Sequence, residues 1–148
     1  MIKKFINKIL DIHPNAMSFQ NSMDLTELPV VTFYQDKKKI NFLLDTGATC
    51  CTIDEAYLKE LKYTPLDVTT TQYGIEGNKV TLNTCNIDIT YKEKGYHCPC
   101  IIRDLSSMTD SIKQESGVTI HGIIGTNFFN SFDYVLDFEK YIAYSKKE

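Results

Sequence analysis

One carboxylate of this 148-residue chain stands where an acid–base catalyst could be held. Asp45 ends the apolar run Phe42-Leu43-Leu44 and is followed by Thr46 and Gly47, a pattern that predicts a strand entering a tight turn. Gly47 permits a backbone geometry that a side chain would forbid. A rigidly placed, partly dry carboxylate can stay ionised or share a proton with a second carboxylate. An ordinary strand ending in an Asx-type turn has the same residues, so both interpretations stay open at this point.

A second segment near the C-terminus shows the same strand-to-glycine pattern without a carboxylate. Ile123 and Ile124 lead into Gly125, and a helix capped by Thr126 or Asn127 is predicted to follow. The helix would bury three aromatic side chains, Phe128, Phe129 and Phe132. Because glycine lets one backbone pack directly on another, Gly125 favours a strand behind the Asp45 turn. Taken alone, the segment also fits a core strand and helix without a functional role.

Together the two segments resemble the aspartic protease family in its single-lobe, retropepsin-like form. The resemblance rests on Leu43-Leu44-Asp45-Thr46-Gly47-Ala48 and on Ile123-Ile124-Gly125 with Asn127, and it extends over residues 29–144. It implies a mostly β, barrel-like lobe with one or two short helices and a flap hairpin. It also implies that Asp45, Thr46 and Gly47 form the catalytic loop, that Ala48 and Thr49 contact substrate, and that Ile123, Ile124, Gly125 and Asn127 are structural.

The segment 72–80 resembles the glycine-tipped flap of these proteases. Gly74 and Gly77 would provide a turn and a hinge, while Tyr73 and Ile75 would close over a bound substrate. The same residues also fit an ordinary surface hairpin, which is the alternative to a flap. We expect these four residues to bind substrate.

The chain departs from the retroviral pattern at two positions. Retroviral members place an acidic residue two positions after the active-site glycine and an arginine after the later glycine, where this chain has Thr49 and Thr126. That charged pair supports the dimer and helps bind the substrate backbone, so we expect a weak dimer. The C-terminal runs 134–138 and 141–144 predict a full hairpin, as in a pepsin-like lobe or a bacterial single-lobe relative.

One carboxylate cannot perform the family's chemistry, in which two aspartates share a proton and activate a water. The chain has no second Asp-Thr-Gly or Asp-Ser-Gly, and Glu115-Ser116-Gly117 lacks a preceding apolar run. The second carboxylate is therefore expected from Asp45 of another copy, in a homodimeric endopeptidase that cleaves peptides or proteins without a metal or cofactor. A non-catalytic peptide-binding or assembly module with the same fold is the alternative.

Composition indicates a globular protein of a reducing compartment. The chain is 43% hydrophobic without a long apolar run, so we expect no membrane span. Its net charge of −3 gives no reason to expect a nucleic-acid partner. Polar residues interrupt the apolar start, so we expect no signal peptide. Five cysteines are an odd count, which favours reduced thiols and a cytoplasmic location. Cys98-Pro99-Cys100 lacks the spacing of a zinc site, and Cys50 is expected to line the substrate cleft.

The sequence predicts two regions. Residues 1–27 would form an amphipathic helix over Ile2–Leu10 and a polar linker over 15–27, and the helix either packs on the domain or serves as a docking or propeptide-like element. Residues 28–148 would form the protease domain. Its predicted strands are 30–34, 40–44, 80–85, 86–91 and 96–102, with a solvated turn at 37–39, a short helix over 54–61 and a loop or ragged helix over 106–115.

Overall fold

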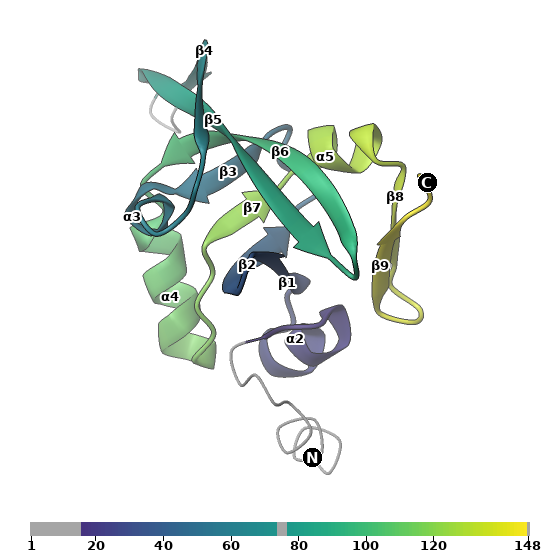
Figure 1. Ribbon diagram of the computed structural model, residues 1–148. Coiled ribbons are helices and arrows are strands. Elements are labelled where there is room, and N and C mark those ends of the chain that lie inside the picture. Colours follow the sequence, from purple (N-terminus) through teal and green to yellow (C-terminus); the bar gives the residue numbers. More distant parts are fainter. Residues whose placement is uncertain (1–15, 74–76, 148) are drawn as a thin grey trace.

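The computed structural model describes residues 16–73 and 77–147, and most of its strands form one closed sheet (Figure 1). The sheet order is β1 (Val30–Gln35), β2 (Lys38–Leu44), β7 (Gly122–Ile124), β3 (Cys51–Asp54), β6 (Lys94–Arg103), β5 (Lys79–Tyr91) and β4 (Thr64–Tyr73). β1 also pairs with β5 through Tyr34 and Thr90, which closes the first six strands into a barrel. The mostly β, barrel-like lobe expected from the sequence is confirmed.

The strands on either side of the first turn match their prediction closely. β1 and β2 pair antiparallel, and Phe33, Ile40 and Phe42 are fully buried between the walls of the barrel. The turn differs from the expected one, because it consists of Asp36 and Lys37, while Lys38 already pairs with Gln35. Asp36 adopts a left-handed φ of 53°, a conformation that aspartate tolerates better than most residues.

β5 is one long strand where the sequence predicted two. Its antiparallel pairing with β6 continues without interruption through Cys85 opposite Cys100 and Asn86 opposite Pro99. Alternate residues therefore point into the barrel along its whole second half, and Cys85, Ile87 and Ile89 are buried.

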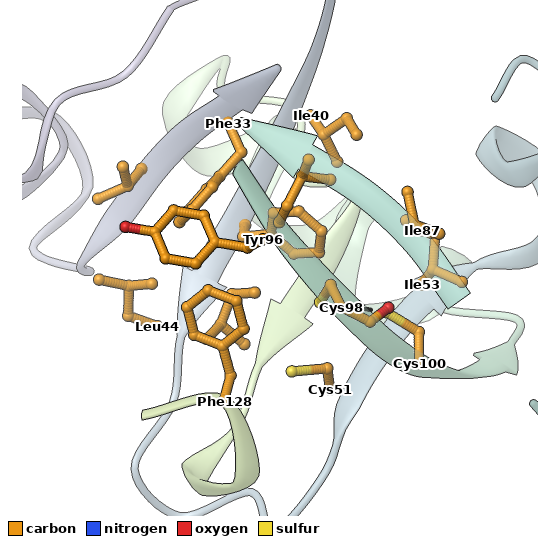
Figure 2. Packing of buried hydrophobic residues seen from close by; sticks show 14 of the residues in the cluster. Phe33, Ile40, Leu44, Cys51, Ile53, Ile87, Tyr96, Cys98, Cys100 and Phe128 are labelled. Carbon is orange, nitrogen blue, oxygen red and sulfur yellow. Dashed lines mark hydrogen bonds between the residues drawn. The ribbon is translucent and has the colours of Figure 1, made fainter. Parts of the chain in front are cut away.

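The barrel core combines aromatic rings with thiols, as Figure 2 shows. Phe128 lies 6.0 Å from Phe33 and 5.3 Å from Tyr96, measured between ring centroids. All five cysteines are free, and the sulfurs of Cys98 and Cys100 lie 3.6 Å apart, too far for a disulfide. The contact with Cys100 is the largest cause that holds the pKa of Cys98 well above its usual value. The Cys98 thiol therefore stays protonated and packs as a small apolar group.

Four helices lie among the described residues, more than the one or two expected: α2 (Phe19–Thr26), α3 (Glu55–Leu58), α4 (Ser106–Ser116) and α5 (Thr126–Ser131). α3 falls inside the short helix predicted over 54–61. α4 is a regular helix where a loop or ragged helix was expected, and it ends at Gly117, whose φ of 78° is left-handed.

Helix α2 replaces the polar linker predicted over 15–27. Ser18 caps it by accepting a hydrogen bond from the Asn21 N–H at 3.1 Å, and Phe19 is only 2% exposed. The Ser22 hydroxyl accepts a hydrogen bond of 2.8 Å from the Val30 N–H. This segment is therefore part of the folded lobe, whereas the helix predicted over Ile2–Leu10 lies outside the described residues.

The C-terminal hairpin is present as predicted. β8 (Tyr134–Asp137) and β9 (Ile142–Ser145) pair with each other in a separate two-stranded sheet beside the barrel (Figure 1). Phe19 of α2 packs on the turn of this hairpin, with ring centroids 5.1 Å from Phe138 and 5.7 Å from Tyr141. No helix in the described part of the chain has the length and hydropathy needed to cross a membrane.

Candidate active site

Asp45 directly follows β2, which lies between β1 and β7 in the barrel wall. β2 runs parallel to β7, with Leu44 beside Ile124, and the Asp45 N–H donates a hydrogen bond of 2.9 Å to the Ile124 carbonyl. Ile124 is fully buried and Ile123 half-buried. The backbone of Asp45 is thus fixed where two parallel strands end.

The Asp45 carboxylate is oriented from one side only. Its Oδ1 accepts a hydrogen bond of 2.8 Å from the Gly47 N–H, and its backbone carbonyl accepts one of 3.2 Å from the Ala48 N–H. A Cβ at Gly47 would lie 3.1 Å from Oδ1, so the glycine gives the carboxylate its room. No described residue donates a hydrogen bond to Oδ2, and Asp45 is half-buried. One oxygen is therefore held while the other is open to a water or a second carboxylate.

The loop after β7 is joined to the Asp45 turn by backbone hydrogen bonds. The Thr126 N–H donates to the Ala48 carbonyl at 2.8 Å, and the Asn127 N–H donates to the Thr49 carbonyl at 3.3 Å. A Cβ added to Gly125 would lie 2.6 Å from the Cys50 carbonyl oxygen and 2.8 Å from that of Ala48. Only glycine lets the two backbones approach this closely.

The helix cap differs from the predicted one. Gly125 occupies the N-cap of α5, and neither Thr126 nor Asn127 caps it. The Asn127 Oδ1 instead accepts hydrogen bonds from the Phe128 N–H at 2.9 Å and from the Cys51 thiol at 3.3 Å. Asn127 therefore connects α5 to β3.

Two threonines of the loop face solvent. Thr46 and Thr49 are exposed, and the Thr46 hydroxyl makes no hydrogen bond within the described part of the chain. Thr49 donates only a weak contact of 3.8 Å to the Cys50 sulfur. Because Thr49 and Thr126 carry no charge, these two residues form no ion pair, and the backbone hydrogen bonds of Thr126 and Asn127 join their two loops.

The predicted flap corresponds to the hairpin of β4 and β5, whose free end projects beyond the barrel (Figure 1). Tyr73 ends β4 opposite Lys79, and Gly77 follows the tip with a φ of 80°, which favours glycine. Gly74 and Ile75 lie outside the described residues. The hairpin bulges between Leu66 and Thr69, where its register shifts.

One cluster that sequence reasoning did not assemble lies around His121. Its Nδ1 accepts a hydrogen bond of 2.9 Å from the Asn41 N–H, and its ring stacks on Tyr57 with centroids 3.8 Å apart. Burial lowers the pKa of His121 to about 4, so the ring is neutral at ordinary pH. No motif signals this cluster, because its residues come from separate strands and a helix.

Comparisons with known proteins identify the fold and the family of the chain. Among solved structures, the protease of the retrovirus EIAV, complexed with the inhibitor HBY-793, matches at a TM-score of 0.50 and 17% identity, over 74% of this chain and 92% of that chain. No curated protein matches. The structural likeness shows a retropepsin-like single-lobe fold. The sequence model described as aspartyl protease matches residues 31–128, more than half of the chain, and the protein therefore belongs to that family.

Proposed function

We propose that the protein is an aspartic endopeptidase that acts as a homodimer. The observation that carries the proposal is the Asp45 carboxylate, which is fixed through Oδ1 and open at Oδ2 in a chain with one Asp-Thr-Gly. A site with two carboxylates then needs a second copy, related by a two-fold axis through the loop.

In the proposed mechanism the two Asp45 carboxylates share one proton, because like charges at close range resist full ionisation. The ionised carboxylate takes a proton from a water, whose oxygen attacks the scissile carbonyl carbon. The protonated carboxylic acid gives its proton to the carbonyl oxygen. Collapse of the tetrahedral intermediate breaks the C–N bond: the carboxyl group that took the proton from water gives it to the amine nitrogen, and the other carboxylate takes a hydroxyl proton, which restores the pair with one shared proton.

The residues next to Asp45 and those of the β4–β5 hairpin would position the partner loop and the substrate. The Thr46 hydroxyl, unused within the described chain, would bind the backbone of the partner loop, and Gly47 presents the turn. Ala48 and Thr49 would contact an extended substrate, while Tyr73, Gly74, Ile75 and Gly77 would form the flap that excludes bulk water. The five free thiols favour a reducing compartment such as the cytoplasm.

A non-catalytic peptide-binding module is the second candidate. It is favoured by the absence of charge at Thr49 and Thr126, the positions where retroviral members hold the pair that supports dimerisation. The intact Asp45 loop favours the enzyme. Peptide binding without cleavage, at concentrations where the protein is dimeric, would select the module.

The direct test is Asp45→Asn. The substitution is nearly isosteric and keeps an acceptor for the Gly47 N–H, but it removes the carboxylate that activates water. We expect an unchanged thermal unfolding midpoint and no cleavage of a peptide library analysed by mass spectrometry. Cleavage at the wild-type rate would show that Asp45 is not the catalyst.

A further inference from the structure

We propose that the barrel carries a second binding site, at the end opposite Asp45, that takes an acidic segment of a polypeptide. A cavity of about 660 Å³ opens there, within the size range of ligand sites. Its polar lining includes Lys37, Lys39, Tyr57 and His121, and its apolar lining includes Met17 and Val118. The inference does not depend on peptidase activity.

The topology separates this cavity from the candidate active site. β2 begins at Lys38 and ends at Leu44, directly before Asp45, so its seven residues span roughly 20 Å. The parallel strand β7 begins at Gly122, directly after His121, and ends beside the Asp45 turn. The cavity therefore lies at the starting ends of this strand pair and Asp45 at their finishing ends.

The charged residues that line the cavity, as far as the structure describes the chain, are Lys37 and Lys39. Within the described part of the chain, Lys37 and Lys39 form no ion pair or hydrogen bond through their ammonium groups, and no Asp or Glu lines the cavity. Neighbouring lysines differ, since Lys62 pairs with Asp36 at 3.5 Å and Lys38 donates to the Glu60 carbonyl. Two free ammonium groups in a chain of net charge −3 mark a local preference for anions.

His121 adds an uncharged hydrogen-bond donor to the lining of the cavity. The Asn41 N–H can only donate, so the Nδ1 that accepts it is unprotonated and the neutral ring carries its proton on Nε2. No described residue accepts a hydrogen bond from Nε2. Stacking on Tyr57 fixes the ring plane, so this N–H is preorganised for a carboxylate or carbonyl oxygen.

The spacing and walls of the cavity favour a peptide over a simple anion. Lys37 lies in the turn before β2 and Lys39 is the second residue of that strand, so two positive charges two positions apart in the sequence line one cavity. This arrangement suits a segment that carries more than one carboxylate. Leu25, which is 50% exposed, is the accessible part of an apolar wall that the nearly buried Met17 and Val118 complete, and it can contact an aliphatic side chain. A simple inorganic anion would leave this wall unused.

Isothermal titration calorimetry tests the site with an acetylated, amidated hexapeptide of alternating glutamate and leucine at low ionic strength. We expect Lys37→Gln with Lys39→Gln to weaken binding about tenfold, since both charged contacts are lost. The matched control, Lys38→Gln with Lys62→Gln, removes the same charge from the same neighbourhood and should change binding less than about twofold.

Three results would overturn the proposal. The first is equal weakening by the two double variants, which would indicate general charge attraction. The second is unchanged binding in the Lys37→Gln, Lys39→Gln variant, which would place the peptide elsewhere, the Asp45 cleft included. The third is that inorganic phosphate, or the same peptide with glutamine in place of glutamate, binds as tightly as the acidic peptide. Either result would show that the site does not select an acidic peptide.

Discussion

At the residue scale, the position of the Asp45 carboxylate depends on how closely two backbones approach. Gly125→Ala would place a methyl group 2.6 Å from the Cys50 carbonyl oxygen, so the loop that carries Asp45 must shift. We expect a loss of about 2 kcal/mol in the free energy of unfolding by urea titration. Peptide cleavage should fall on the order of 100-fold, because a small misplacement of a catalytic group is costly.

Gly95→Ala is the matched control for this substitution. A Cβ at Gly95 meets nothing within 4 Å, and its φ is not left-handed, so stability and cleavage should stay close to wild type. If Gly125→Ala behaves like this control, the close approach behind the Asp45 turn has no role in holding the carboxylate.

His121 gives the lobe a stability that depends on pH. Its pKa is about 4 in the folded state and 6.5 without burial, so below pH 6.5 the unfolded chain binds a proton that the folded chain does not. Stability is therefore complete above pH 6.5 and falls as the pH drops toward 4, by at most about 3 kcal/mol. Asp54 partly offsets the shift by favouring the charged ring.

Urea titrations between pH 7 and 4 check this dependence. His121→Asn keeps an acceptor for the Asn41 N–H but cannot titrate, so its stability should change less with pH than that of wild type. An unchanged slope in His121→Asn would exclude His121 as its source.

Residue types reveal some sites and hide others for a physical reason. The Asp45 loop could be predicted because the proposed chemistry needs an apolar strand, a carboxylate and a glycine in direct succession. The cavity at the other end of the barrel could not be predicted, because its residues Lys39, Tyr57 and His121 come together only when the barrel closes. The lysine run at 37–39 looked like a solvated turn, since nothing local distinguishes paired from unpaired lysines.

At the element scale, the alternation of apolar and polar residues predicts the buried strands. It does not predict elements that bury only a few of their side chains. β4 is rich in threonine and mostly exposed, so its sequence lacks the apolar alternation that marked β1 and β2. The sequence of α2 resembles a linker because only Phe19 and Met23 pack on the core, Leu25 is half-exposed and the other residues are polar. Tertiary contacts, not local propensity, stabilise both elements.

α2 connects the N-terminal side of the lobe to the C-terminal hairpin. Because Phe19 is buried against Phe138 and Tyr141, Phe19→Ala should cost about 3 kcal/mol in the free energy of unfolding. Hydrogen exchange should accelerate in β8 and β9. Leu25→Ala, on the same helix at a half-exposed side chain, should change both measurements little. Unaltered exchange in the hairpin of Phe19→Ala would show that α2 does not hold it.

At the scale of the whole molecule, the single lobe contains half of the proposed site. The sequence could predict the need for a second copy by counting carboxylates, since one Asp-Thr-Gly cannot supply two. It could not predict the strength of association, which depends on surfaces such as the C-terminal hairpin, where Ile142 and Tyr144 are about 40% exposed. The uncharged Thr49 and Thr126 lead us to expect a weak dimer.

A weak dimer makes activity depend on concentration in a specific way. On dilution through the dimer dissociation constant, activity per chain should fall, because mass action removes the competent species. Excess Asp45→Asn protein should also inhibit wild type, since each mixed dimer holds one carboxylate and one amide and cannot share a proton as the mechanism requires. Light scattering and peptide cleavage measured over one dilution series, with and without the variant, test both effects. Constant activity per chain where scattering detects only monomer, together with no inhibition by Asp45→Asn, would rule out the shared site.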